Sequence, residues 1–297
     1  MRSHFITNFL LLLLAVSLGL FLFTDDINQN GIRPLSSIEA DSINHINIQH
    51  NQREIVLQKT GAEWQLTEPV NISANQFRIK TLLNLLGTDS HAQYNTDQLE
   101  LNKYGLDEAR TSIHFNQARF IFGIVNPMNN LRYVMYNQQL HLIDDHVYPL
   151  LSSQIGTLVA RELFPAETNI SKLVLPEHTL TRNQDGLWQS NDDISSDAIV
   201  ETLYQWTHKQ AFAVHDYVKR DSLGEIQVFI DGSDGPINFS ITDVDPWLII
   251  ARPDIKLEYH FNLEDYDALL RPGSLKQAPE DSLQVSPDEF IKAIQSE

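Results

Sequence analysis

One uncharged stretch of the chain is long enough to cross a membrane. Phe5 to Phe23 is nineteen residues without a charged side chain, preceded by Arg2 and followed by Asp25 and Asp26. As a helix rising 1.5 Å per residue it would measure about 28 Å, close to the hydrocarbon thickness of a bilayer. The sequence therefore predicts a transmembrane anchor over residues 5–23.

The charges around this stretch predict its orientation. Residues 1–4 carry Arg2 and the terminal amine, whereas the next basic residue is Arg33. By the positive-inside rule, residues 1–4 are expected in the cytoplasm and the chain from about Thr24 onward in the periplasm. The predicted localisation is a single-pass protein of the bacterial inner membrane.

A cleaved signal peptide is the alternative to an anchor. Its cleavage site would be the small-residue run Ala15-Val16-Ser17, which would leave the apolar segment from Leu18 to Phe23 at the new N-terminus. The chain has no cysteine. A lipid anchor on cysteine, a disulfide and a thiolate metal site are therefore excluded.

The charge balance is strongly acidic, with 39 acidic and 21 basic residues. Residues 38–160 hold 12 acidic and 8 basic residues, whereas residues 161–297 hold 25 and 11. Nucleic acid and anionic lipid surfaces are poor partners for such a chain. A basic partner surface could dock on the second half, although acidic surfaces also serve solubility alone.

The same order of elements is predicted twice. Strands ending at Trp64, a helix with Leu82 and Leu83, and further strands make a first unit, residues 38–164. Strands ending at Trp188, a helix starting near Ser195, and further strands repeat this order in residues 165–271. Residues 24–37 are expected to be a linker, and residues 272–297 a tail with a short helix.

Short strands joined by tight turns favour antiparallel sheets, each with a helix on one face. The predicted fold class is thus α+β: an N-terminal transmembrane helix followed by two tandem antiparallel-sheet-plus-helix units that arose by internal duplication. Trp64 and Trp188 are expected to fill equivalent corners between strand and helix, as core residues more than as ligand platforms.

Several segments of the first unit resemble the bacterial family catalogued as domain of unknown function 4340. They are the Leu82-Leu83 helix, the run from Leu101 to Asp107, Phe120-Ile121-Phe122-Gly123, and Tyr133-Val134. The chain departs from the family at Asn75, where aspartate is usual, and at Ala109, where proline is usual. The resemblance implies membrane-anchored extracytoplasmic proteins, some encoded beside or fused to ABC-transporter parts, with no established catalytic residues.

Within the run from Leu101 to Asp107, Tyr104-Gly105-Leu106 is the most specific motif. A glycine between two large apolar residues, after a polar stretch, indicates a tight turn with positive φ. Tyr104 and Leu106 are expected to pack on either side of it. This reading makes the motif structural.

Possible metal ligands are densest at His141, Asp144, Asp145 and His146. On an extended strand positions 141 and 146 point to opposite faces, so a sharp turn at Asp144-Asp145 would be needed to join both imidazoles at one ion. An ordinary solvated loop is the simpler interpretation. We assign no catalytic residue, cofactor or metal from the sequence.

Two aspartate-rich turns are further candidate sites. The run from Asp231 to Pro236 has the composition of a calcium loop but lacks the ligand spacing of an EF-hand, so a hairpin turn is expected. Asp243 and Asp245 could act as an acid-base pair, although Pro246 and Trp247 place them equally well at a hairpin edge.

Three functions are compatible with these patterns. The leading hypothesis is a non-catalytic interaction module, an accessory subunit of an envelope or ABC-transporter-type complex whose partners are other envelope or membrane proteins. The second is a solute- or glycan-binding protein whose ligand lies between the two units and stacks on an exposed tryptophan such as Trp206 or Trp247. The third is a hydrolase that uses scattered aspartate and histidine residues.

Overall fold

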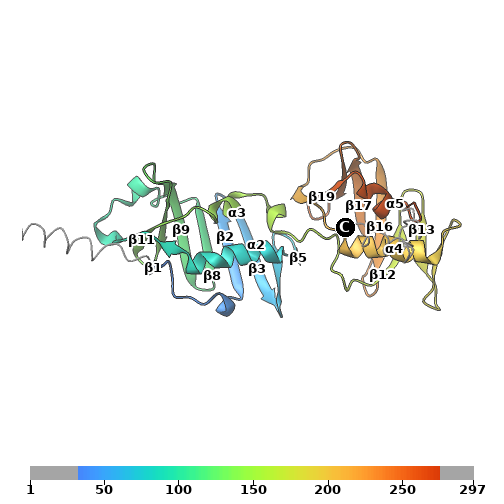
Figure 1. The fold of residues 1–297 in the computed structure, drawn as a ribbon, viewed down its shortest axis with the longest axis horizontal. Coiled ribbons are helices and arrows are strands. Elements are labelled where there is room, and N and C mark those ends of the chain that lie inside the picture. The colour runs from blue at the N-terminus through green and yellow to red at the C-terminus, as the bar shows by residue number, and fades with distance from the viewer. Residues whose placement is uncertain (1–32, 275–297) are drawn as a thin grey trace, which may run out of the picture. The chain divides into compact units, whose positions relative to one another are not determined.

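A computed structural model describes residues 33–274 of the chain. These residues form two compact units, which divide between Val159 and Ala160 (Figure 1). We call residues 33–159 unit 1 and residues 160–274 unit 2. The division precedes the predicted join at residue 165 because Phe164 packs inside unit 2, where its ring lies 6.5 Å from that of Trp206.

Unit 1 is built on a nine-stranded sheet whose neighbouring strands all pair antiparallel. Its order is β5 (Ile72–Ser73), β4 (Glu63–Glu68), β3 (Arg53–Thr60), β2 (His45–His50), β8 (Thr111–Phe115), β9 (Ala118–Val125), β10 (Arg132–Tyr136), β11 (Gln139–Ile143) and β7 (Ala92–Asn95). A separate two-stranded sheet joins β1 (Arg33–Pro34) to β6 (Asp89–Ser90).

Short helices cover one face of this sheet. They are α2 (Gln76–Leu83) and α3 (Tyr148–Ser152). The 3-10 turns of unit 1 are η1 (Ala40–Ser42), η2 (Asn84–Gly87), η3 (Thr96–Gln98), η4 (Leu101–Tyr104) and η5 (Ile155–Leu158), and of these η3 and η4 belong to the connection from β7 to β8. Alternate residues of β2, such as Ile46 and Ile48, are fully buried, as are Ile79 and Leu82 of α2. This period-two burial makes one face of the sheet the core of unit 1.

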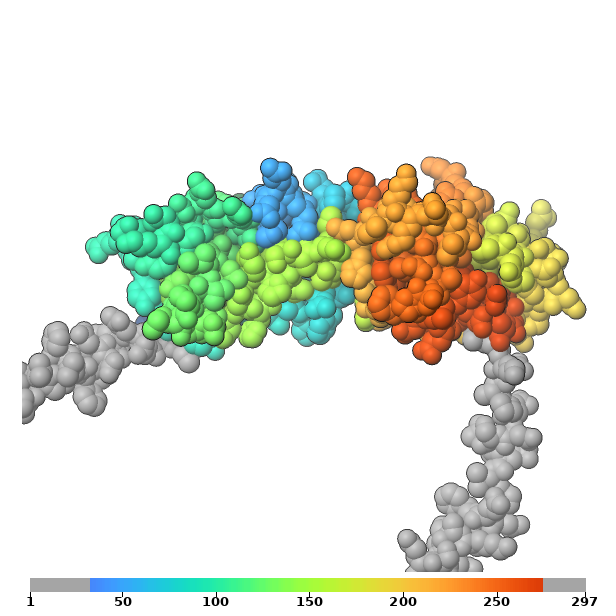
Figure 2. Space-filling model, turned by 90° about the horizontal axis from the view of Figure 1, so that it is seen from above, coloured from blue at the N-terminus to red at the C-terminus, as the bar shows by residue number. Residues whose placement is uncertain are grey.

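Unit 2 contains an eight-stranded antiparallel sheet with two helices. The strand order is β14 (Trp188–Ser190), β13 (Thr179–Arg182), β12 (Ile170–Val174), β16 (Gly224–Ile230), β17 (Ile237–Asp243), β18 (Trp247–Arg252), β19 (Leu257–Asn262) and β15 (Ala213–Asp216). The helices are α4 (Ser196–His208) and α5 (Asp265–Leu270). Trp206 of α4 packs edge to face on Phe239 of β17, so both belong to the core. Figure 2 shows the surface of both units, with the residues of unit 1 in blue to green and most of those of unit 2 in yellow to red.

The two units share one topology. From β4 the first sheet reads β4-β3-β2-β8-β9-β10-β11-β7, and from β14 the second reads β14-β13-β12-β16-β17-β18-β19-β15. When β1, β5 and β6 are left out, strands at the same position in the two sheets also have the same place in the chain order of their unit. Helices α2 and α4 each follow the third of these strands, and α3 and α5 each follow the last. Strand β5 and the small β1-β6 sheet are additions to unit 1.

Two predictions drawn from the N-terminal apolar stretch are corrected. Residues 5–23 lie outside the described residues, and none of the helices within residues 33–274 is long and apolar enough to cross a membrane. The longest of them, α4, has 13 residues, which gives about 20 Å against about 30 Å of hydrocarbon. Within residues 33–274 the fold thus contains no transmembrane helix, against the predicted fold class with such a helix and the predicted single-pass inner-membrane localisation.

The balance of helix and strand also differs from the predicted α+β class. Nineteen strands lie in three sheets of the described chain, and its helices are few and short. The described fold is mostly antiparallel sheet. Of the predicted linker, residues 24–32 lie outside the described residues, as does the predicted tail helix, whereas residues 33–34 form β1 and Leu35 is buried.

Candidate functional site

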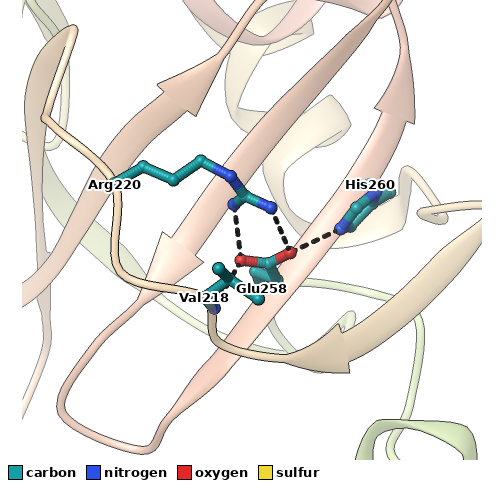
Figure 3. Close-up of polar contacts among 4 residues, drawn as sticks. All are labelled: Val218, Arg220, Glu258 and His260. Carbon is teal, nitrogen blue, oxygen red and sulfur yellow. Dashed lines mark hydrogen bonds and ion pairs between the residues drawn. The ribbon is translucent and has the colours of Figure 1, made fainter.

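A buried charged cluster lies on the face of the unit 2 sheet that is opposite the helices. Glu258 and His260 are two residues apart on β19, so both side chains point to this face. His215 of β15 pairs directly with Glu258 and shares the face. The connection from β15 to β16 crosses here and places Arg220 over β19 (Figure 3).

Both oxygens of Glu258 are saturated by hydrogen bonds. Arg220 donates from Nη1 to Oε2 at 2.8 Å and from Nη2 to Oε1 at 3.2 Å. The backbone N–H of Val218 donates to Oε2 at 3.0 Å, and His260 Nε2 lies 2.9 Å from Oε1 (Figure 3). The Glu258 side chain is only 2% exposed. We call these four residues the Glu258 cluster.

The cluster shifts the ionisation of its members. Burial alone would raise the pKa of Glu258, but the hydrogen bonds from Arg220, Val218 and His260 outweigh it and hold the pKa below the usual value. The hydrogen bond to Glu258 raises the pKa of Arg220. Burial lowers the pKa of His260, although its bond to Glu258 opposes this shift. The carboxylate is therefore a fixed anchor with little capacity left to accept a substrate proton.

Two exposed aromatic rings adjoin the cluster. Phe212, just before β15, and Trp247, the first residue of β18, are 42% and 47% exposed. Their ring centroids lie 5.7 Å apart in an edge-to-face arrangement. The ring of His260 lies 6.1 Å from Phe212 and 6.5 Å from Trp247. We call Phe212 and Trp247 the aromatic patch, and His260 links it to the Glu258 cluster.

The structure separates the side chains considered as metal ligands. His141 is buried, with Nδ1 3.0 Å from Ser90 Oγ, and burial lowers its pKa. Asp144 pairs with His91 at 2.9 Å, and Asp145 pairs with Arg132 at 2.8 Å. His146 is exposed. Within residues 33–274, no three His, Asp or Glu side chains gather as a metal-binding group.

The aspartates of the two aspartate-rich turns are bonded within unit 2. Asp231 follows β16 and pairs with Arg182. Asp243 Oδ1 accepts the backbone N–H groups of Val244 and Asp245, which shapes the turn between β17 and β18. Asp245 itself is exposed beside Trp247.

The Tyr104-Gly105-Leu106 motif packs the connection from β7 to β8 against β9. Gly105 has a φ of 68° and ends η4. Its main chain lies so close to β9 that an added Cβ would be 2.8 Å from Ile124 Cγ2, and a Cβ on Gly123 would be 2.2 Å from Tyr104 O. Leu106 is buried, and the Tyr104 ring packs edge to face on Tyr133 at 4.9 Å. Both glycines allow this close approach.

The two tryptophans expected at equivalent corners differ in burial. Trp64 is 5% exposed, and its backbone N–H and C=O both bond the side chain of Gln76, the first residue of α2. Trp188 lies on the edge strand β14 and is half-buried. The fully buried tryptophan of unit 2 is Trp206, whose Nε1 donates to Leu269 O at 2.8 Å.

Sequence reasoning did not find the Glu258 cluster. Its one signal is Glu258-Tyr259-His260, in which a carboxylate and an imidazole lie on either side of a tyrosine inside a mostly buried strand. The partner Arg220 is 38 residues earlier in the chain. No local pattern connects it to Glu258.

Comparison with known proteins identifies the family. The model of the family described as "Domain of unknown function (DUF4340)" matches residues 64–234, which is more than half of the chain. The chain belongs to the DUF4340 family. The match begins in β4 of unit 1 and ends after β16 of unit 2, so it includes the motif around Gly105 and Arg220 of the Glu258 cluster. No curated protein and no solved structure matched the chain in the same comparison.

Proposed function

We propose that this DUF4340 protein is a non-catalytic interaction module, an accessory subunit of a larger complex that binds its partner through unit 2. The observation that carries the proposal is the aromatic patch of Phe212 and Trp247. Adjacent exposed aromatic rings are costly to leave in water, and tryptophan is enriched among the residues that dominate binding energies at interfaces.

The surroundings of the patch favour binding by a rigid surface. His260 contacts both rings, and its own ring is fixed by Glu258, which Arg220 and the Val218 N–H hold in place. A preorganised surface loses little side-chain entropy when a partner docks. Because both oxygens of Glu258 already accept hydrogen bonds, we assign the cluster to support of the surface and not to acid-base chemistry.

The family resemblance indicates which partners to test first. ABC-transporter parts accompany some members of the family, so such proteins are our first candidates for the partner. The hydrolase alternative stays untested.

Site-specific photo-crosslinking in cells tests this function. A photoreactive phenylalanine analogue at position 212 should give a discrete crosslinked product, and Trp247→Ala should remove it because the patch loses its larger ring. The same analogue at Phe77, which is 73% exposed on α2 of unit 1, is the matched control. No product from position 212, or an equal product from position 77, would contradict the proposal.

Binding of a solute or glycan is a second candidate, favoured by the exposure of Trp247. Aromatic faces of this kind also stack on sugars. Trp206, the other tryptophan considered for this role, is fully buried and is no candidate. A thermal-shift screen of the protein against sugars, with Trp247→Ala as control, distinguishes this function. A shift that disappears in the variant would support it.

A further inference from the structure

We propose that the aromatic patch recognises a protein segment rich in arginine or lysine, with a cationic side chain over the face of Trp247. This inference rests on the interaction-module function and names the chemistry of its partner. It requires an exposed aromatic face, an acidic rim, and no basic side chain competing for the same place.

The aromatic face meets the first requirement. Tryptophan is the best side chain for attracting a cation to its ring face. Trp247 is 47% exposed, and Phe212 meets it edge to face, so the two rings support each other while part of the indole stays in water. His260 backs both rings on the side of the Glu258 cluster.

Acidic residues border Trp247 on two sides. Asp245 is exposed two residues before it. On the neighbouring strand, Trp247 pairs with Asn262, and the exposed Glu264 follows two residues later. A cation placed on the indole would thus lie in a negative potential from two directions.

Basic side chains of unit 2 near the patch are already bonded to other groups. Arg161, whose C=O accepts the N–H of Ala211 beside Phe212, donates to Gln210 Oε1. Arg220, on the connection from β15 to β16, makes two hydrogen bonds to Glu258. Lys209 pairs with Asp265, and Arg252 pairs with Asp254. The described part of unit 2 has 20 acidic and 9 basic residues, so its net field also attracts a basic segment.

These charges decide between the two occupants of an aromatic platform. A neutral sugar would gain from stacking but nothing from the net charge of the rim, whereas a basic segment gains from both. The observations therefore favour a basic protein segment.

Fluorescence titration of the whole protein with a labelled peptide of alternating glycine and arginine tests the proposal. Trp247→Ala should weaken binding about fivefold or more, because it removes the cation-π contact. Asp245→Asn and Glu264→Gln should each weaken it, and raising the salt concentration should weaken it further. A peptide with citrulline in place of arginine should bind far more weakly.

Two variants serve as matched controls. Tyr204→Ala removes an exposed aromatic ring of α4, and Asp234→Asn removes an exposed carboxylate in the turn between β16 and β17. Both should bind the peptide like the unaltered protein. Circular dichroism should show that every variant is folded, and Trp247→Phe, which keeps a ring, should bind with intermediate affinity.

Three results would overturn the proposal. The first is that Trp247→Ala binds the peptide as tightly as the unaltered protein. The second is that Asp234→Asn loses as much peptide affinity as Asp245→Asn. The third is that the arginine peptide does not bind below about 1 mM. Crosslinking from position 212 separates this failure from that of the function. If the crosslinked product persists while the peptide fails, the module function stands and the basic chemistry is wrong. If both fail, the module function is wrong as well.

Discussion

Glu258 shows how one residue can fix a loop over a sheet. Its carboxylate is nearly fully buried and joins the β15–β16 connection, through Arg220 and the Val218 N–H, to His260 on its own strand. A buried carboxylate is tolerated only when its oxygens are paired in this way. The surface around His260 and the aromatic patch depends on that pairing.

Replacing Glu258 with glutamine should destabilise unit 2 by about 2 kcal/mol or more, because charged hydrogen bonds to Arg220 are lost. Glu225→Gln is the control, since Glu225 lies on the same sheet but is exposed and accepts only a 3.3 Å bond from Ser240. Urea unfolding followed by tryptophan fluorescence in a Trp64→Phe background isolates unit 2, which holds the three remaining tryptophans. If Glu258→Gln and Glu225→Gln lower the free energy of unfolding of unit 2 equally, Glu258 does not anchor the loop.

The pH dependence of unit 2 follows from the same residues. Burial lowers the pKa of His260 in the folded state below its usual 6.5, so the unfolded chain binds this proton more readily. The free energy of unfolding should therefore fall as pH drops through about 6.5. Glu258, whose folded pKa lies below 4.5, adds a further loss as pH falls below that value.

The same fluorescence assay, repeated between neutral and acidic pH, measures this effect. His260→Gln should flatten the loss that occurs near pH 6.5 and leave the loss at lower pH. An unchanged profile in this variant would show that another group controls the pH response.

At the scale of elements, both units use the connection between equivalent strands to cover the face opposite the helices. In unit 1 this is the β7–β8 connection, which holds Tyr104-Gly105-Leu106 and docks on Gly123 of β9. In unit 2 it is the β15–β16 connection, which carries Arg220 to Glu258. One connection is held by close backbone packing and the other by charge.

A pair of alanine substitutions separates backbone strain from close packing. Gly61 and Gly105 have nearly equal φ values, 64° and 68°, but an added Cβ meets no atom within 4 Å at Gly61 and meets Ile124 at 2.8 Å at Gly105. Gly61→Ala should cost unit 1 about 1 kcal/mol of stability, from φ strain alone. Gly105→Ala should cost about 1–3 kcal/mol more. Equal costs, measured by urea unfolding, would mean that the close contact is unimportant.

Local sequence signals predict the helix starts better than the helix faces. Ser195 caps α4, with its Oγ accepting from Ala198 N, where the sequence indicates a cap. Before α2 the sequence offers two cap-forming residues, Ser73 and Asn75, and Asn75 is the cap because Ser73 of β5 pairs with Gln65 of β4. Val200 of α4 is apolar and follows the fully buried Ile199, yet it is 53% exposed. Tertiary packing decides which strands pair and which face a helix turns to the core. Local propensity cannot predict either.

The candidate site was less predictable than the elements for the same reason. Trp247 and its neighbouring aspartates are visible in the sequence, but only the sheet order brings Phe212 of the β15 edge beside them. Trp188 likewise has the sequence position of Trp64, yet it lies on an edge strand and is half-buried. The core position in unit 2 is taken by Trp206.

At the scale of the whole molecule, the repeated topology gives each unit its own core. Ile46, Ile79 and Leu82 are buried within unit 1, and Trp206 and Phe239 are buried within unit 2. Loss of one core should therefore leave the other folded. The binding function proposed for unit 2 depends on this independence.

Hydrogen exchange measured by mass spectrometry on Trp206→Ala tests this account most directly. Removing the Trp206 ring should cost about 3–5 kcal/mol, because a fully buried side chain and its bond to Leu269 O are lost together. Trp188→Ala, at a half-buried edge position, is the control and should cost less. We predict that Trp206→Ala loses protection throughout residues 160–274 and keeps it in the sheet of residues 33–159. Loss of protection across both ranges would contradict two separate cores.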